Sequence, residues 1–387
     1  MAEQYVSDAV KYVGVDDRKI DLFESQYQVP NGVSYNSYLI LDQKIAIMDT
    51  VDKRATETWL ANVEHVLDGR EPDYLIISHM EPDHAANIQN IAQKYPAMQL
   101  VGNGKTFQML SQFFSLPLEG RTITVKEGDE LSLGEHTLVF YMAPMVHWPE
   151  VMVEYEKKEQ ILFSADGFGK FGALDAEEDW APEARRYYIN IVGKYGAQVQ
   201  ALLKKASGLA ISKICPLHGP ILTENLGYYI EKYDIWSSYR PEEKGVLVAY
   251  ASIHGNTKEA AEKMAELLKQ AGVEKIKVTD LSRADLAEAI ADAFYYDRML
   301  LACATYDGGL FPVMEDFLLH LKSKNYQKRK VVLIENGSWA PFAAKKMKEY
   351  LEQMKDIELC NPIVTIKSVR KADTLETMKQ LVSSLKD

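Results

Sequence analysis

Cysteine is scarce in this sequence, and positive charge is in deficit. The 387 residues include three cysteines, Cys215, Cys303 and Cys360, which are far apart and form no Cys-x-x-Cys pair. This spacing argues against a disulfide framework, a thiolate zinc site, an iron–sulfur cluster and a rubredoxin-type centre. The formal net charge is -12. Because a generic nucleic-acid binder needs a basic surface, that class of function is disfavoured.

Long apolar runs are also missing. No stretch approaches the roughly 18 consecutive apolar residues of a membrane span. Residues 1–15 carry charged side chains throughout and lack the apolar segment of a signal peptide. These absences predict a soluble, cytoplasmic protein with no membrane partner. The chain exceeds the size at which one hydrophobic core stops growing, so we expect two domains.

The segment 78–84 holds four residues that can bind a metal: His79, Glu81, Asp83 and His84. It follows residues 74–77, an apolar run typical of a buried strand, and a helical pattern starts after it. The four side chains are therefore expected on one strand-to-helix loop. So many polar groups are costly to bury unless a cation holds them. The alternative is a polar surface turn that caps the next helix.

Three later residues follow predicted strands in the same way. The strands 137–143, 160–164 and 210–215 lead to His147, Asp166 and His218, respectively. Side chains at the ends of successive strands can meet at one site. Seven candidate ligands are too many for one tetrahedral site and suit two metals, with Asp166, alone on its loop, as the natural bridge. Each histidine taken alone could instead be a hydrogen-bonded surface residue.

The sequence pattern changes along the chain. Residues 20–165 read mainly as short strands and hairpins, and residues 181–207 as one helical stretch. From residue 245 strands alternate with helices, the predicted strands being 246–251, 276–280, 298–302, 331–335 and 362–366. Five such strand–helix units predict a doubly wound parallel sheet. We therefore expect an N-terminal domain over 1–244 and a C-terminal domain over 245–387.

The loops of the C-terminal domain predict a flavin site. The first strand runs into hydroxyl groups, a glycine and the first N–H groups of a helix, which together suit a phosphate. Neither the lysine of a nucleoside-triphosphate loop nor the Gly-x-Gly-x-x-Gly pattern of dinucleotide sites is present, so the single phosphate of FMN fits best. The candidate FMN-binding residues on three loops are Ser252, Ile253, His254, Gly255, Asn256, Thr257, Ala304, Thr305, Tyr306, Asp307, Gly308, Gly309, Asn336, Gly337, Ser338 and Trp339. The alternative is ordinary loop chemistry, with the two aromatic residues in the core.

The N-terminal motif resembles the metallo-β-lactamase fold. In that fold His-x-His-x-Asp-His precedes a further His, a bridging Asp and a last His, and here Glu81 stands in place of the second histidine. A carboxylate gives a harder donor set, which suits iron or manganese better than zinc. The N-terminal metal motif and the C-terminal flavin-binding domain together resemble the flavodiiron protein family, and this resemblance covers the whole chain. This resemblance implies a metallo-β-lactamase-like αββα sandwich of the α+β class, followed by a flavodoxin-like α/β doubly wound parallel sheet.

The resemblance also implies a function. Members of the family are oxidoreductases that reduce dioxygen to water, nitric oxide to nitrous oxide, or both, at a non-haem diiron centre that receives electrons from FMN. By resemblance one iron is held by His79, Glu81 and His147, the other by Asp83, His84 and His218, and Asp166 bridges the two. A tyrosine or histidine often lines the substrate pocket in the family, and Tyr195 is the catalytic candidate here. Residues 23–26, where some members carry a histidine, contain none.

The implied partners are an electron donor and a second copy of the chain. The donor is external, either a rubredoxin-like protein or a reduced deazaflavin, and the copies form a head-to-tail homodimer or a dimer of dimers.

Two other functions stay open: a dinuclear metal hydrolase with an accessory flavodoxin-like domain, and a flavin electron carrier with an inert metal domain. Glu81 argues against the hydrolase, and the complete ligand set argues against the carrier. The sequence does not decide between dioxygen and nitric oxide.

Overall fold

The computed structural model describes residues 5–386, so the outermost residues of the predicted domain ranges 1–244 and 245–387 lie outside it. The described chain forms two compact units. One runs up to Tyr188 and also contains Ala197–Asp234; the other contains Ile189–Gly196 and the chain from Ile235 onward. This boundary lies earlier than the expected one after residue 244. Strand β16 begins at Glu243, which already pairs with Tyr296 in the sheet of the second unit.

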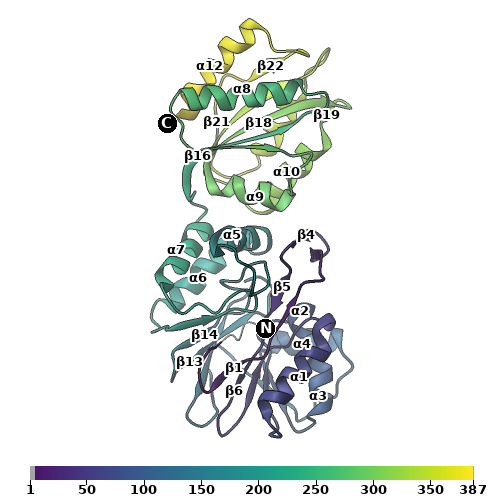
Figure 1. Ribbon diagram of the computed structural model, residues 1–387, viewed down its shortest axis with the longest axis vertical. Helices are drawn as coiled ribbons and strands as arrows, with labels where there is room; N and C mark the ends of the chain where they lie inside the picture. Colours follow the sequence, from purple (N-terminus) through teal and green to yellow (C-terminus); the bar gives the residue numbers. More distant parts are fainter. Residues whose placement is uncertain (1–4, 387) are drawn as a thin grey trace. The chain divides into compact units, whose positions relative to one another are not determined.

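The first unit is a sandwich of two β-sheets with helices on both outer faces (Figure 1). The six-stranded sheet has the order β1-β6-β7-β8-β9-β10, and the five-stranded sheet has the order β11-β12-β13-β14-β15. The strands are β1 (Val10–Tyr12), β6 (Tyr38–Ile40), β7 (Ala46–Met48), β8 (Tyr74–Ile76), β9 (Gln99–Gly102), β10 (Thr122–Thr124), β11 (Glu130–Ser132), β12 (Thr137–Met142), β13 (Met152–Glu156), β14 (Ile161–Phe163) and β15 (Lys213–Cys215). Two small sheets pair β2 (Val15–Asp17) with β5 (Val33–Tyr35) and β3 (Leu22–Phe23) with β4 (Tyr27–Gln28).

The helices before β15 are η1 (Lys53–Ala55), α1 (Thr56–Leu67), α2 (Pro82–Ala85), α3 (Ile88–Lys94), α4 (Gly104–Phe113), α5 (Trp180–Ile191), η2 (Gly193–Tyr195) and α6 (Gly196–Ala206), and α7 (Leu226–Ser237) follows it. The expected single helix over 181–207 is therefore broken into α5, η2 and α6. Glycines at 193 and 196 weaken the helix at this point. The α5–α6 junction also packs tightly, since a Cβ at Gly196 would lie 2.3 Å from the Ser237 carbonyl oxygen.

The core of the first unit lies between its two sheets. Ile40 and Ile76 of the six-stranded sheet form one buried cluster with Phe140 and Phe163 of the five-stranded sheet. The apolar run that leads into segment 78–84 is confirmed as the buried strand β8, which pairs in parallel with β7 and β9. A parallel strand covered on both faces has no polar side to alternate with, which explains its uninterrupted apolar sequence.

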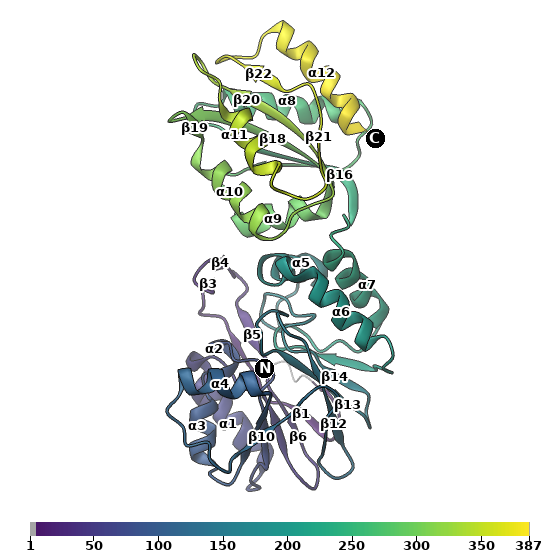
Figure 2. The same cartoon turned by 180° about the vertical axis from the view of Figure 1, so that it is seen from behind.

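The second unit is a parallel sheet with helices on both faces (Figure 2). The expected doubly wound sheet is confirmed, and its main strand order is β17-β16-β18-β20-β21, the flavodoxin-like order 2-1-3-4-5. The strands are β16 (Glu243–Ala251), β17 (Ile276–Asp280), β18 (Tyr296–Tyr306), β19 (Gly309–Leu310), β20 (Arg329–Asn336), β21 (Ile357–Leu359) and β22 (Val364–Ile366). The helices are α8 (Asn256–Gln270), α9 (Leu286–Tyr295), α10 (Pro312–Ser323), α11 (Ala343–Leu351) and α12 (Ala372–Lys386).

Helix α8 packs beside α12, and α10 packs between α9 and α11. The buried residues Val248, Leu300 and Val332 of the sheet form a core with Met264 of α8 and Leu381 of α12. Since β16, β18 and β20 run in parallel, their carboxyl ends and the loops that follow them share one edge of the sheet. Among residues 5–386, no helix combines the length and apolar character needed to cross a membrane.

Candidate metal centre and flavin pocket

All seven predicted metal ligands lie on loops or helix starts that follow strands of the first unit. Segment 78–84 leads from β8 into the short helix α2, while His147 follows β12, Asp166 follows β14 and His218 follows β15. The two sheets are joined here, since Met152 N donates to the Ser78 carbonyl oxygen at 3.1 Å. Ligands from both sheets therefore reach one site at the edge of the sandwich.

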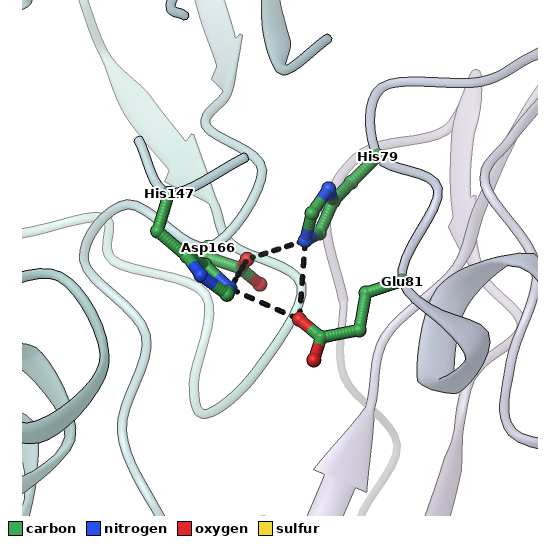
Figure 3. Close-up of side chains that lie close together, drawn as sticks. All are labelled: His79, Glu81, His147 and Asp166. Atoms are coloured by element: carbon green, nitrogen blue, oxygen red, sulfur yellow. Dashed lines mark hydrogen bonds and ion pairs between the residues drawn. The ribbon is translucent and has the colours of Figure 1, made fainter. Parts of the chain in front are cut away.

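The first ligand group consists of His79, Glu81, His147 and Asp166, whose side chains converge in Figure 3. Glu81 Oε2 lies 3.2 Å from His79 Nε2 and 2.9 Å from His147 Nε2. Asp166 Oδ2 lies 3.2 Å from His79 Nε2 and 3.4 Å from His147 Nε2. Two nitrogens and two oxygens thus surround one point, an arrangement that a single cation can satisfy.

The second ligand group consists of Asp83, His84 and His218. Asp83 Oδ2 lies 3.3 Å from His84 Nε2 and 3.2 Å from His218 Nε2. The remaining oxygen of Asp166, Oδ1, lies 3.5 Å from His84 Nε2 and 3.8 Å from His218 Nε2. Asp166 therefore presents Oδ2 to the first group and Oδ1 to the second, which is how a carboxylate bridges two metals.

The chain holds two of the ligand histidines, His79 and His218, in place through their other ring nitrogens. His79 Nδ1 lies 2.8 Å from Glu150 Oε1, which also accepts a hydrogen bond from Met80 N. His218 Nδ1 lies 2.7 Å from the Ser34 carbonyl oxygen. Such partners fix the ring orientation and direct Nε2 at the metal position, as is usual for metal-binding histidines.

The buried carboxylates show that the site suits a cation. Both oxygens of Asp83 and both oxygens of Asp166 are buried and accept no hydrogen bond within the described residues. Burying a carboxylate without hydrogen bonds or a counter-charge is costly, so such groups are paired or bind metal. The donor set of imidazole nitrogens and carboxylate oxygens fits two divalent metals of the iron or manganese type.

The pKa values of the ligands reflect their mutual charge. Burial disfavours a charged imidazole, but Asp83 and Asp166 outweigh it and raise the pKa of His84 to about 10. Burial likewise opposes charge on His147, but Asp166 and Glu81 raise its pKa to about 9. Burial alone would raise the pKa of Asp166, yet His79, His147 and His84 hold it well below its usual range. The metal-free site therefore retains protons that a metal must displace.

Tyr195 is not among the residues that the described structure brings to the ligands. It lies in η2, is half-buried, and its ring lies 5.7 Å from Lys194 Nζ. Tyr187 of α5 is buried instead with its ring 5.5 Å from that of His218, and Phe23 lies 5.3 Å from the same ring. Burial, followed by the charges of Asp166 and Asp83, raises the pKa of Tyr187 well above its usual range. The sequence alone could not have identified Tyr187, rather than the adjacent Tyr188, as the tyrosine that packs against His218.

The three loops of the second unit surround a pocket with a volume of about 590 Å³, within the usual range for small-molecule sites. Helix α8 starts at this pocket with no side-chain cap, so its N-terminal N–H groups suit a phosphate. The predicted residues that line it are Ile253, His254, Asn256, Thr257, Ala304, Thr305, Asp307, Gly308, Asn336, Gly337, Ser338 and Trp339. Ala340, Phe342 and Ser368 also line it and were not predicted.

Four predicted flavin residues, Ser252, Gly255, Tyr306 and Gly309, are not among the lining residues. Ser252 Oγ accepts a hydrogen bond from Gly255 N at 3.2 Å and so shapes the loop from within. The Tyr306 ring packs edge-on against Phe311 at 5.6 Å, while Gly309 pairs with Tyr306 in the β18–β19 hairpin. Of the two aromatic residues predicted on these loops, Trp339 therefore lines the pocket and Tyr306 does not.

Comparison with known proteins agrees with both halves of this arrangement. Residues 33–219 match a family model described as ODP family beta lactamase, and residues 247–362 match a flavodoxin domain model. An uncharacterized protein of Methanocaldococcus jannaschii is 30% identical over 99% of this chain and 98% of that protein. A nitric oxide reductase of Moorella thermoacetica is 29% identical over 97% of this chain and 96% of that protein. The solved structure of rubredoxin oxygen:oxidoreductase from Desulfovibrio gigas superposes with a TM-score of 0.91 at 26% identity, covering 99% of this chain and 97% of that one.

Proposed function

The chain belongs to the flavodiiron protein family, and from this we propose that it reduces dioxygen, nitric oxide or both at a diiron centre that receives electrons from FMN. The observation that carries the proposal is the position of Asp166, which offers one oxygen to each of two buried ligand groups. Each group has two imidazoles and a carboxylate of its own besides this shared one. Two histidines with carboxylate oxygen are typical of non-haem iron sites.

When bound, the irons supply electrons and polarise oxygen atoms of the substrate. The ligand residues hold the two metal positions next to each other, so that two small gas molecules, or both atoms of one, are brought together. Asp166 fixes the separation of the positions, while Glu150 and the Ser34 carbonyl fix the rings of His79 and His218. The buried rings of Phe23 and Tyr187 exclude water beside His218.

Tyr187 holds a proton at its phenolic oxygen. Its pKa is raised well above the usual range, by burial first and then by the nearby carboxylates, so the hydroxyl stays protonated at neutral pH. We propose that it donates a hydrogen bond to substrate, the role expected earlier of Tyr195. Tyr187→Phe should keep iron content and lower kcat; unchanged kcat would rule this role out.

The pocket of the second unit would hold FMN, which when bound would supply one-electron transfer. The N-terminus of α8 and the residues Asn256 and Thr257 are placed to hold its phosphate, and Trp339 is placed to cover its ring. The sequence has no dinucleotide motif and no Cys-x-x-Cys pair, so the first electron donor is an external protein or a reduced deazaflavin. Rapid turnover with NADH and the purified chain alone would contradict this part of the proposal.

We also propose a head-to-tail homodimer in which the flavin of one copy faces the irons of the other. Large apolar side chains stand exposed at the flavin pocket, where Trp339 is 90% and Ile253 is 40% accessible. A second copy that covers them would bury this surface. The test uses a heterodimer of one subunit with Asp166→Ala and His84→Ala and another with Asn256→Ala and Thr257→Ala. Each homodimer should be inactive and the heterodimer active; an inactive heterodimer that retains both intact cofactors would contradict the arrangement.

The competing function is a dinuclear metal hydrolase. The placement of Glu81 disfavours it, since this carboxylate lies within 3.2 Å of both His79 Nε2 and His147 Nε2 and gives an oxygen-rich donor set that suits iron better than zinc. Metal analysis, the visible spectrum and parallel turnover assays with each gas distinguish the functions. Iron together with flavin and turnover of a gas is expected. Zinc without flavin would support the hydrolase, and flavin without metal would support a simple electron carrier.

A further inference from the structure

An apolar cavity of about 220 Å³ lies in the first unit, behind the metal-binding loops. Its lining residues come from helices α6 and α7 on one side and from strands β12 to β15 on the other. Its outer end is formed by half-buried or exposed residues, among them Leu203, Ala206 and Ile230. Its inner end is formed by buried residues, among them Val146 and Phe168. The cavity thus leads from the protein surface toward the interior.

The inner end of the cavity adjoins two metal ligands. Val146 immediately precedes His147, and Ser164, Gly167 and Phe168 belong to the turn that carries Asp166. This turn is closed by a hydrogen bond of 2.9 Å from Gly167 N to the Ser164 carbonyl oxygen. The inner end of the cavity is therefore lined by residues of the same two loops that bear His147 and Asp166.

The side chains of Ser164, Ser207 and Lys205, which line the cavity, are already hydrogen-bonded within the protein. Ser164 Oγ donates to the Gly167 carbonyl oxygen at 2.6 Å, and Ser207 Oγ donates to the Lys204 carbonyl oxygen at 2.8 Å. Lys205 Nζ, at the rim, is bound to Glu127 Oε2 at 2.9 Å and to the Met142 carbonyl oxygen at 2.8 Å. A polar ligand would find few partners here, whereas apolar cavities of this size class bind apolar molecules such as xenon.

Phe168 lies at the boundary between the cavity and the Asp166 turn in an unusual conformation. Its φ is +66°, in the left-handed region that bulky side chains rarely adopt. Tyr233 supports this conformation, since its hydroxyl accepts a hydrogen bond from Phe168 N at 2.5 Å and its ring stacks on the Phe168 ring at 4.2 Å. Persistent local strain of this kind is concentrated at functional sites.

We propose that this cavity takes up the gaseous substrate, a small apolar diatomic molecule, and delivers it past Phe168 to the metal centre. The inference rests on the proposed function, because only a gas substrate needs an apolar route. Dioxygen and nitric oxide are both small and nearly apolar, so they partition from water into such a space. The loops that carry His147 and Asp166 would then receive substrate from the space between α6, α7 and the five-stranded sheet rather than from bulk water.

The test combines xenon binding with variants that fill the outer half of the cavity. Crystals of the intact holoenzyme under xenon pressure should show xenon between α6 and the five-stranded sheet, and Leu203→Trp should abolish this binding. Leu203→Trp and Ala206→Phe should lower kcat/KM for the gas severalfold, with kcat at saturating gas, iron content and FMN content unchanged. The matched control is Lys204→Trp, because Lys204 is exposed on the same helix and does not line the cavity; it should behave like the wild type.

Two results would overturn the proposal: absence of xenon from the cavity, or xenon binding with an unchanged kcat/KM in both filled variants. A wild-type holoenzyme that reduces neither gas would instead refute the proposed function and, with it, delivery of substrate. Xenon binding would in that case still decide whether the cavity accepts an apolar gas.

Discussion

The Nε2 atoms of His84 and His218 lie 3.0 Å apart, and Asp83 Oδ2 lies within 3.3 Å of both. Two nitrogens at roughly 2.1 Å from one metal and at right angles to each other are separated by about this distance. The rings come from segments far apart in sequence and meet in a buried position. This geometry suits adjacent ligands of one metal ion.

Metal binding to the metal-free protein should weaken as the pH falls. His84 and His147 have pKa values raised to about 10 and about 9, so at neutral pH both hold protons that the metal must displace. Apparent affinity should rise by up to about tenfold per pH unit for each proton displaced. Anaerobic titrations with ferrous or cobaltous ion from about pH 6 to about pH 9 measure this. A flat profile would show that the ligands are not protonated in the free site.

The same two histidines should make the stability of the metal-free protein pH-dependent. Because their folded pKa values are raised, their stabilising contribution is fully present below the unfolded value of about 6.5 and is lost as the pH rises through the folded values. The Tm of the metal-free protein should therefore fall from neutral to alkaline pH more than that of the metal-loaded protein. Equal slopes for the two forms in thermal scans would contradict this.

Asp166→Asn should weaken both metal positions, whereas Glu81→Gln should weaken mainly the first. The reason is that Asp166 faces both ligand groups, while Glu81 contacts only His79 and His147 among the ligand histidines. Iron per chain after gel filtration should approach zero in the first variant and one in the second, with FMN content unchanged. Asp52→Asn is the control, because this carboxylate caps η1 and pairs with Arg54 but belongs to neither ligand group. Equal iron loss in both metal-site variants would contradict the bridging role.

Glu81→His should shift metal content toward zinc and lower reductase activity. The substitution restores the His-x-His-x-Asp-His pattern and replaces an oxygen donor beside His147 Nε2 with a nitrogen donor. Metal analysis of protein produced with both iron and zinc present gives the ratio directly. If the variant keeps its iron and full turnover, Glu81 is not the residue that selects the metal.

Glu150→Gln should lower metal affinity at the first position by about 10- to 100-fold, the usual effect of losing a carboxylate behind a ligating histidine. Glu150 Oε1 lies 2.8 Å from His79 Nδ1 and from Met80 N, and an amide would hold the ring less firmly. Competition titration with a chelator measures the change, and affinity at the second position serves as an internal control. A uniform loss at both positions would point to a general structural defect instead.

Gly337→Ala should reduce FMN affinity while leaving iron content intact. A Cβ at this position would lie 2.7 Å from Pro341 Cα and 3.2 Å from Thr305 Oγ1, so the pocket loop must move. Fluorescence titration of the flavin-free protein with FMN measures the loss. Gly104→Ala is the control, because a Cβ there meets nothing within 4 Å and its backbone is helical. Unchanged FMN affinity would show that this loop does not shape the site.

Much of this protein could be predicted from sequence because its informative features are local. The four ligand candidates of segment 78–84 lie on one short loop after an apolar strand, and the alternation of strand and helix after residue 245 is visible without any long-range contact. The parallel arrangement of β16, β18 and β20 then follows, and with it the shared edge of the three flavin loops. The replacement of a histidine by Glu81, which favours iron, is a property of the sequence alone.

Only the tertiary structure decided which way individual side chains face. It placed Tyr187 rather than Tyr195 against His218, and packed the Tyr306 ring against Phe311. It also divided the oxygens of Asp166 between two ligand groups and left an apolar cavity behind the loop that carries it. These outcomes depend on packing between segments far apart in the chain, where small differences in backbone direction rotate a side chain from one surface to another. Periodicity and spacing in the sequence carry no information about such contacts. The residue types therefore identified the candidate metal and flavin ligands, while tertiary packing decided which side chains face each site.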